Sequence, residues 1–209
     1  MGLPILVIGR SGSGKTSSLR NFTNDVFVNN VNKKLLPFKG NDHIKLYDTD
    51  EYLVIKQLLK KAYEKGVKTA VIDDAGYLMT AKFMAGHKQA KGNSQFDLYN
   101  EIGDNYYSLI RYVVDELPAD MNVYFFMHEE MNDMGYSKPK TIGKLLDDKV
   151  CIEGMFTIVL HSMKLDGKYV FATRTDGLDV TKTPIGMFEQ DYIDNDLQLV
   201  DNTIREYYK

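Results

Sequence analysis

The stretch Gly9-Arg10-Ser11-Gly12-Ser13-Gly14-Lys15-Thr16 decides the fold of this 209-residue chain. It matches G-x-x-x-x-G-K-[ST], a phosphate-binding loop (P-loop) in which glycines let backbone N–H groups approach phosphate oxygens. In this pattern the lysine reaches the β- and γ-phosphates, and the hydroxyl that follows it ligates Mg²⁺. We therefore predict that residues 9–17, Ser17 included, bind a nucleotide, with Lys15 as a catalytic cation and Thr16 as a metal ligand.

The segments on either side of this loop suit a nucleotide site. Ile5-Leu6-Val7-Ile8 is a short apolar run typical of a buried parallel strand, and we expect a strand over 4–8. Residues 15–23 are expected to form a helix, whose N-terminus adds partial positive charge beside the phosphates. The alternative is a glycine-rich turn that binds nothing.

The composition is that of a soluble globular protein. Hydrophobic residues make up 44% and charged residues 26%, so 209 residues suffice for one α/β domain spanning 1–209. The net charge of −3 gives no overall attraction to nucleic acid, so any such contact needs a local patch. A single cysteine, Cys151, excludes an internal disulfide. With no secretory signal and no membrane-length apolar stretch, we expect a cytoplasmic protein without membrane partners.

Apolar strands and amphipathic helices alternate along the chain, which predicts an α/β fold with a mostly parallel central sheet flanked by helices. Further strands are expected at 43–47, 69–72, 123–127, 156–161 and 169–173, the last two forming a C-terminal hairpin that turns at Asp166-Gly167. Helices are expected at 52–65, 95–117 and 193–208, with a less regular region at 79–94. The polar residues 24–42 are interpreted as an excursion that holds a small hairpin.

A P-loop needs a carboxylate at the end of a nearby strand to hold Mg²⁺. The run Ala70-Val71-Ile72-Asp73-Asp74 supplies one, and we predict that Asp73 lies in the metal shell. A helix cap or a surface acid is the alternative.

An enzyme that hydrolyses the nucleotide also needs a group that activates water. Asp74 is one candidate. The other is Asp50, or its neighbour Glu51, because the strand at 43–47 is expected to lie beside the strand at 69–72. These acids also suit the N-terminus of the helix that follows, so the choice stays open.

His128 directly follows the strand at 123–127, and ligands of such sheets bind beyond the carboxyl ends of the strands. We predict that His128 hydrogen-bonds a γ-phosphate and reports it to the loop 129–149; the alternative is that it ties its own loop to the strand. That loop carries an aromatic and several lysines that suit single-stranded DNA, namely Tyr136, Lys138, Lys140 and Lys144. Because Asp147 and Asp148 dilute this charge, a plain solvated loop is equally compatible.

Phosphoryl transfer often uses a further cation. Only five arginines are present, and the candidates late in the chain are Arg174 and Lys182, acting in their own subunit or on a neighbour. A surface ion pair is the alternative for both.

The motifs separate the nucleotide classes. Asp73-Asp74-Ala75-Gly76 fits the D-x-x-G of GTPases, but the chain has no [NT]-K-x-D motif for guanine. A nucleotide kinase would need an arginine-rich lid. We therefore expect ATP with Mg²⁺.

Several segments besides the P-loop resemble bacteriophage RecA-like ATP-binding proteins of the AAA type, some of which anneal single strands. The resemblance covers nearly the whole chain and rests on residues 70–74 (AVIDD), 124–128 (YFFMH), 140–144 (KTIGK), 153–156 (EGMF) and 181–188 (TKTPIGMF). It implies a RecA-like ATPase in phage recombination or replication that acts on single-stranded DNA, with other phage replication or recombination proteins or further copies of itself as partners.

The resemblance also implies roles for single residues. His128 would sense the γ-phosphate, Asp50 would be the catalytic acid, and Lys182 would be a finger presented to the ATP of a neighbouring subunit. RecA has glutamine, glutamate and serine at the positions of His128, Asp50 and Asp74.

The P-loop begins at residue 9, so we expect no N-terminal docking segment of the kind that RecA filaments use. An ATP-gated adaptor or helicase loader is the alternative function. A helicase-like or terminase-like motor would need an accessory domain.

Overall fold

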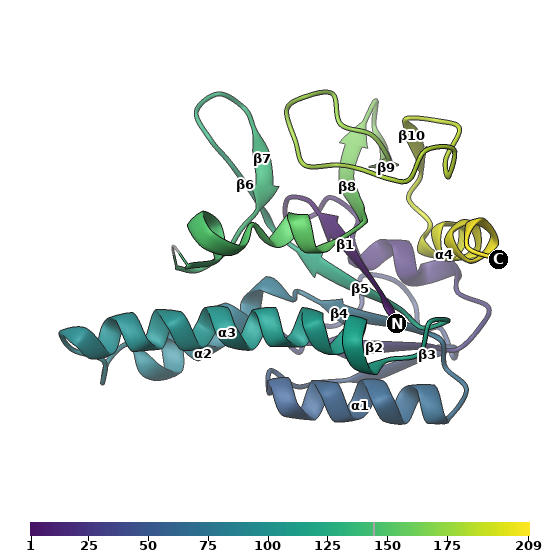
Figure 1. Cartoon of the computed structure of the whole chain (residues 1–209). Helices are drawn as coiled ribbons and strands as arrows, with labels where there is room; N and C mark the ends of the chain where they lie inside the picture. The colour runs from purple at the N-terminus through teal and green to yellow at the C-terminus, as the bar shows by residue number, and fades with distance from the viewer. Residues whose placement is uncertain (144) are drawn as a thin grey trace.

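The computed structural model of the chain describes residues 1–143 and 145–209 and is organised around an eight-stranded sheet (Figure 1). Its parallel strands are β1 (Leu3–Ile8), β2 (Val26–Asn30), β3 (Ile44–Tyr47), β4 (Thr69–Asp73), β5 (Asn122–Met127) and β8 (Ile158–Leu165). At one edge, β9 (Lys168–Ala172) is antiparallel to β8, and β10 (Tyr192–Asp194) is antiparallel to β9. The order is β10-β9-β8-β1-β5-β4-β2-β3. The predicted α/β fold with a mostly parallel central sheet, including the C-terminal hairpin β8–β9, is confirmed.

The central strands are apolar on both sides because both faces of the sheet are covered. Successive side chains of a strand point to opposite faces. In β1, Ile5 and Val7 therefore pack on one face, whereas Leu6 and Ile8 pack on the other. All four side chains are fully buried, so β1 lies where the two halves of the core meet.

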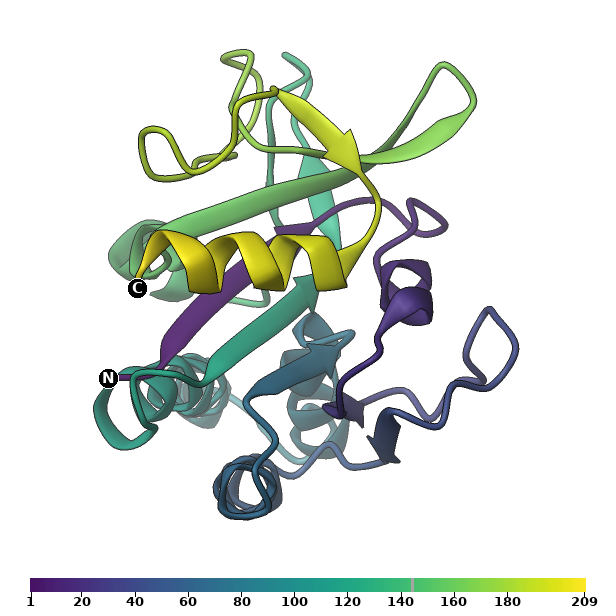
Figure 2. The same ribbon diagram turned by 90° about the vertical axis from the view of Figure 1, so that its right-hand side faces the viewer.

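Helices cover the two faces unequally. One face carries the long helices α1 (Tyr52–Glu64), α2 (Gly76–Gly86) and α3 (Asn93–Glu116). The other carries a short 3-10 helix, η1 (Thr16–Asn21), and the C-terminal helix α4 (Leu197–Tyr207), which crosses the sheet in Figure 2. Within the described residues, no helix combines the length and the apolar character needed to cross a membrane.

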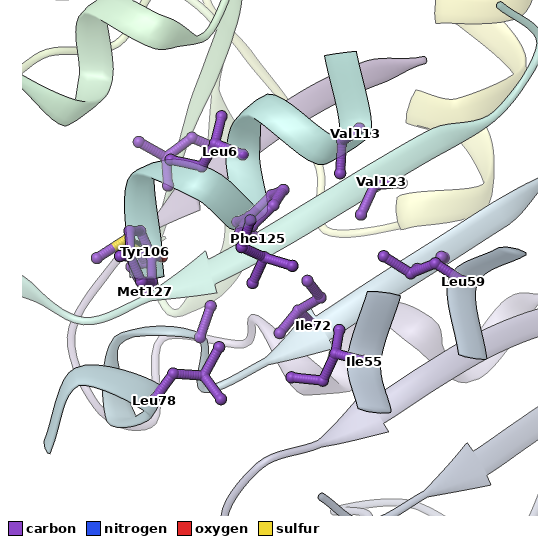
Figure 3. Close-up of a cluster of buried hydrophobic side chains, with 14 of the residues drawn as sticks. Leu6, Ile55, Leu59, Ile72, Leu78, Tyr106, Val113, Val123, Phe125 and Met127 are labelled. Atoms are coloured by element: carbon purple, nitrogen blue, oxygen red, sulfur yellow. Dashed lines mark hydrogen bonds between the residues drawn. The ribbon is translucent and has the colours of Figure 1, made fainter. Parts of the chain in front are cut away.

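The larger half of the core lies between the sheet and helices α1 and α3 (Figure 3). Phe125 of β5 is fully buried there. Its ring meets Phe156 edge-to-face at 5.5 Å between centroids and Tyr106 at 6.5 Å. The Tyr106 hydroxyl donates to Met127 Sδ at 3.0 Å, which gives this buried polar atom a partner.

The prediction of a hairpin-bearing excursion over 24–42 is wrong in its first part. Val26–Asn30 forms β2, which pairs in parallel with both β4 and β3 inside the main sheet. Val26, Phe27 and Val28 are all buried, so this segment is a core strand although polar residues surround it. The strand Ile44–Tyr47 therefore lies at the edge of the sheet and not beside β4.

Four further boundaries differ from the prediction. The helix expected over 15–23 is shorter and is a 3-10 helix, Thr16–Asn21. The region 79–94, expected to be less regular, is mostly helical, since it holds most of α2 and the start of α3. The last helix begins at Leu197 and not at Ile193, which belongs to β10. Asp196 is its N-cap and accepts hydrogen bonds from the backbone N–H groups of Gln198 and Leu199. The loop 129–149 contains the hairpin β6 (Glu129–Met131) and β7 (Ser137–Pro139), followed by the π-helix η2 (Leu145–Val150) and the 3-10 helix η3 (Ile152–Met155).

Replacing Phe125 with alanine is expected to lower the free energy of unfolding by about 3–5 kcal/mol, because the cavity would lie between two aromatic rings and the sheet. Equilibrium urea denaturation followed by circular dichroism measures this. Phe96→Ala is the matched control, because Phe96 is 72% exposed on α3. Similar losses in both variants would contradict the core described above.

Candidate functional site

The carboxyl ends of four parallel strands meet at one edge of the sheet. The P-loop follows β1, Asp73 ends β4, and His128 follows β5. The strand register brings these ends to the same level, since Ile8 pairs with Met127 and Asp73 pairs with Asn30 at the end of β2. A hollow of about 530 Å³ opens at this edge, and its lining includes residues 11–17, residues 34–37, Asp73, Asp74, His128 and Tyr169.

Glycine is required at two positions of the P-loop. A Cβ on Gly9 would lie 2.4 Å from the carbonyl oxygen of Ser162, so only glycine lets the loop approach β8. Gly14 has a φ of +102°, and a Cβ there would meet Tyr169 and Asn195 at 3.1 Å. The Ser162 hydroxyl donates to the carbonyl of Ser13 at 2.9 Å and holds the loop in this position.

The loop presents unused backbone donors. Ser13 N–H donates to the Arg10 carbonyl and Ser18 N–H to the Gly14 carbonyl. Among the residues that the structure describes, the N–H groups of residues 14–17 have no acceptor. These groups lie at the start of η1 and in the two residues before it, where backbone donors lack intrahelical partners. They form a site for an anion with several oxygens, such as a phosphate chain.

Lys15 supplies a buried cation beside these donors. Its side chain folds back over the loop, and Nζ donates to the carbonyls of Gly9 at 2.7 Å and Arg10 at 3.0 Å. Burial lowers the pKa of Lys15 to about 8, although Asp74 and Asp73 oppose this shift. A phosphate in the hollow would favour the charged form of Lys15 and replace its two carbonyl partners.

Thr16 and Asp73 form the oxygen pair expected of a Mg²⁺ site. Thr16 Oγ1 donates to Asp73 Oδ2 at 2.9 Å and lies 3.1 Å from Oδ1. Burial and the neighbouring Asp74 raise the pKa of Asp73 to about 6, against the hydrogen bond from Thr16. Within the described residues, no group of three or more His, Cys, Asp or Glu side chains could hold a metal. This donor set fits Mg²⁺, which takes few protein ligands and completes its shell with phosphate and water.

Asp74 is held in place by three donors. Its backbone has a φ of +60°, and its carboxylate accepts from Lys34 Nζ at 2.6 Å and from Asn32 Nδ2 at 2.8 Å, and lies 3.4 Å from His128 Nε2. Burial alone would raise the pKa of Asp74, but the hydrogen bonds from His128, Lys34 and Asn32 outweigh it and hold the pKa well below its usual range. Asp74 is therefore a charged carboxylate that faces the phosphate site.

His128 lies at the carboxyl end of β5, beside the hollow. The ring lines the hollow, contacts Asp74 and meets the ring of Tyr77 edge-on at 5.7 Å. Its backbone carbonyl accepts from Lys140 N–H at 2.8 Å, so the strand end is joined to the segment that follows β7.

The structure does not bring Asp50 to the site. Asp50 follows the edge strand β3, and β2 separates β3 from β4. Asp50 is exposed and does not line the hollow, while Glu51 occupies the N-cap position of α1. The expectation failed because it placed the strand 43–47 next to β4, where β2 lies.

Neither predicted finger residue lines the hollow of its own chain. Arg174 donates to Asp191 Oδ1 and to the Phe188 carbonyl, both at 2.7 Å, so it is bound within its own loop. Lys182 is exposed and pairs through its backbone with Val159 of β8. Both remain candidates for action on a neighbouring subunit.

The predicted DNA-binding residues lie on and beside the β6–β7 hairpin. Tyr136 is 36% exposed, Lys138 pairs with Glu130 across the hairpin at 3.3 Å, and Lys140 is exposed beside a second hollow that also contacts His128. Lys144 lies outside the described residues. Figure 1 shows that the hairpin projects from the same edge of the sheet as the P-loop.

Sequence reasoning missed an ionic chain that joins the P-loop to two later segments. His161 Nε2 lies 2.7 Å from Glu129 Oε2, and His161 Nδ1 lies 2.7 Å from Asp179 Oδ2. Arg10 reaches the same Glu129 at 3.3 Å. Burial would lower the pKa of His161, but its two carboxylate partners raise it to about 9. The charged ring therefore fixes Glu129, the residue after His128.

Two further residues of the hollow, Lys34 and Tyr169, were missed as well. Tyr169 is 45% exposed on β9 and packs close to Gly14. The apolar run Val26-Phe27-Val28 could have pointed to Lys34. If this run is taken as a strand of the sheet, the residues that follow it lie at the carboxyl edge, where the hollow opens.

Comparisons with known proteins give a match to one protein family. Residues 1–184 match a family model described as AAA domain, a span that includes the P-loop, Asp73, Asp74 and His128. A comparison with curated proteins found no match. Among solved structures, the chain is similar to a KaiC-like protein from the hyperthermophilic archaeon Pyrococcus horikoshii OT3, with 11% sequence identity and a TM-score of 0.46. That match covers 81% of this chain and 76% of the other.

Acid is expected to weaken Mg²⁺-dependent nucleotide binding, because protons compete with the metal for Asp73, whose pKa is about 6. The Mg²⁺ concentration for half-maximal binding should rise about tenfold from pH 7 to pH 5 through this one carboxylate. Titrations with a fluorescent ATP analogue measure it. Asp73→Asn corrects for protonation of the nucleotide itself, and an equally steep pH dependence in that variant would contradict the assignment.

Proposed function

Because the chain belongs to the AAA domain family, as its resemblance predicted, we propose that it binds Mg-ATP and hydrolyses it. One observation carries this proposal. The unpaired N–H groups of residues 14–17, the buried ammonium of Lys15 and the Thr16–Asp73 pair all belong to residues that line one hollow. Donors, cation and metal ligands are the parts that phosphoryl transfer needs in a P-loop protein.

Each part has a separate task. The N–H groups of residues 14–17 hold the phosphate oxygens, and Lys15 exchanges the carbonyls of Gly9 and Arg10 for the β- and γ-phosphates. Thr16 and Asp73 would hold the Mg²⁺ ion. When bound, this ion neutralises charge that develops on the phosphates.

Asp74 is the proposed group that orients the attacking water. It is charged, lies next to Asp73, and lines the same hollow. A carboxylate with three donors and a low pKa is a weak proton acceptor, so turnover is slow until some of those donors are withdrawn. His128 contacts Asp74 and is the proposed sensor of the γ-phosphate.

The proposed biological role is binding or annealing of single-stranded DNA in phage recombination or replication. The resemblance to bacteriophage RecA-like proteins supports this role, as does the hairpin that begins one residue after His128. Its exposed Tyr136 offers a stacking surface, and Lys140 offers a charge for a phosphate. Lys182 and Arg174 are proposed to act on a neighbouring copy, since neither lines its own hollow.

A second candidate is an ATP-gated adaptor or loader that binds a replication protein. Exposed methionines on the hairpin favour it, since Met134 in the turn is 87% exposed and Met131 on β6 is 48% exposed. Flexible methionines are common on surfaces that bind protein partners. The net charge of −3 also suits a protein partner better than a polyanion.

Lys15→Ala is expected to weaken ATP binding at least about tenfold and to remove turnover, because hydrogen bonds to charged phosphates would be lost. Asp74→Asn is expected to bind ATP but to hydrolyse it much more slowly. Calorimetry and a phosphate-release assay measure these effects. Lys60→Ala, an exposed lysine of α1, is the control. Normal turnover in Lys15→Ala would overturn the proposed function.

Single-stranded DNA is expected to bind more tightly in the presence of a slowly hydrolysed ATP analogue, with an affinity that falls as salt rises. Fluorescence polarisation of a labelled oligonucleotide measures this. A variant with alanine at Lys138, Lys140 and Lys144 should bind the oligonucleotide at least about tenfold more weakly.

The matched control removes the same charge at the C-terminal end of α1, by alanine at the exposed residues Lys60 and Lys61 and at the exposed C-cap residue Lys65. Equal losses in the two triple variants would leave only a general charge effect. Failure of the wild-type protein to bind DNA in any nucleotide state would favour the adaptor.

A further inference from the structure

Lys34 is held at the nucleotide site by the strand next to β4. It lies in the segment after β2, where Asn30 binds its backbone from both sides. Asn30 Nδ2 donates to the Lys34 carbonyl at 2.9 Å, and Lys34 N–H donates to Asn30 Oδ1 at 3.1 Å. Asn30 is buried and pairs with Asp73 across the sheet. The Lys34 backbone therefore has a fixed position relative to the metal-site carboxylate.

The Lys34 side chain reaches from there into the phosphate hollow. Its Nζ lies 2.6 Å from Asp74 Oδ2 and 5.6 Å from the centre of the Tyr77 ring. Lys34 lines the same hollow as the P-loop, and Lys15 is the other lysine in that lining. Whereas Asp74 is 11% exposed, the Lys34 side chain is 60% exposed, so its end can move without displacing the core.

We propose that Lys34 is a second phosphate-binding cation, which exchanges the Asp74 carboxylate for the terminal phosphate of a bound nucleoside triphosphate. This inference rests on the proposed ATP binding and adds to it a means of telling ATP from ADP. A diphosphate has no group at that place, so Lys34 stays on Asp74 when ADP is bound.

Asp74 can release Lys34 without being left unpaired. Asn32 donates to the same oxygen at 2.8 Å, and His128 lies 3.4 Å from the other oxygen. A buried carboxylate that loses all its donors bears a large desolvation cost, but this one keeps two. The lysine has a flexible four-carbon stem, and a phosphate with more than one negative charge attracts it more strongly than a carboxylate does.

The exchange would also prepare the site for hydrolysis. While Lys34 binds Asp74, one oxygen of the carboxylate that orients water is occupied by the lysine. Once Lys34 moves to the terminal phosphate, that oxygen keeps Asn32 as its donor and can accept a hydrogen bond from the attacking water. One lysine then both neutralises charge on the reacting phosphate and frees the group that orients water.

The test compares affinities for Mg-ATPγS and Mg-ADP by isothermal titration calorimetry, so that the readout is binding and not turnover. Lys34→Met is expected to weaken ATPγS binding about tenfold or more and to change ADP binding less than about twofold. Lys34→Arg, which keeps the charge, should retain most of the preference for ATPγS. Lys33→Met is the matched control, because Lys33 is the exposed neighbour that does not line the hollow.

An unchanged ratio of the two affinities in Lys34→Met would overturn the inference and leave Lys34 as a static ion pair. Equal losses for both nucleotides would overturn it as well, because Lys34 would then only support the fold of the site. If Lys34→Met does not fold, Lys34→Gln carries the same comparison. Failure of the proposed function has a different signature, namely a wild-type protein that binds neither nucleotide, or Lys15→Ala protein that binds both normally.

Discussion

The hydrogen bond between Thr16 and Asp73 joins two strands that are not neighbours, and the rest of the site depends on the strand between them. Thr16 follows β1 and Asp73 ends β4, with β5 in the middle. The registers of Ile8 with Met127 and of Ile72 with Phe125 bring all three strand ends to one level. A slip of one residue would turn every side chain of a strand to the opposite face. The contacts of Phe125 with Tyr106 and Phe156 oppose such a slip. Packing in the core therefore fixes the positions of the site residues at the strand ends.

The site is assembled from charges that are balanced only in part. Two buried carboxylates, Asp73 and Asp74, lie side by side, with Lys15 and Lys34 close to them. The pKa of Lys15 is lowered and the pKa of Asp73 is raised, because burial outweighs the attraction between their opposite charges. Both shifts favour the neutral form of the side chain. A bound phosphate chain would supply negative charge beside Lys15, and its metal ion would supply positive charge beside Asp73. The protein thus keeps electrostatic free energy available for the ligand, which favours binding of the metal and the nucleotide together.

Local sequence patterns predicted the parts of the site that lie within one strand and its following turn. The P-loop, Asp73-Asp74 and His128 each follow an apolar run, and parallel packing brings the ends of such runs together. The order of the strands is not written in any one segment, which is why Asp50 was placed wrongly and Lys34 was missed. The three apolar residues of β2 are too few, among polar neighbours, to distinguish a core strand from a hairpin arm. The ionic chain through His161 joins Arg10, Glu129, His161 and Asp179, whose successive separations along the chain are 119, 32 and 18 residues, and no local spacing predicts it.

The nucleotide site and the hairpin are joined too firmly for the hairpin to act as a loose loop. His128 contacts Asp74 through its ring, and the next residue, Glu129, is bound by both Arg10 and His161. The hairpin is fixed again at its other strand, where Ser137 N–H donates to the Leu178 carbonyl and Lys140 N–H to the His128 carbonyl. A shift of His128 toward a γ-phosphate would therefore move β6 and β7 together with the segment that carries Asp179. The lysines proposed to bind DNA and the methionines proposed to bind a protein would then move as one body, so the proposed coupling suits either proposed partner.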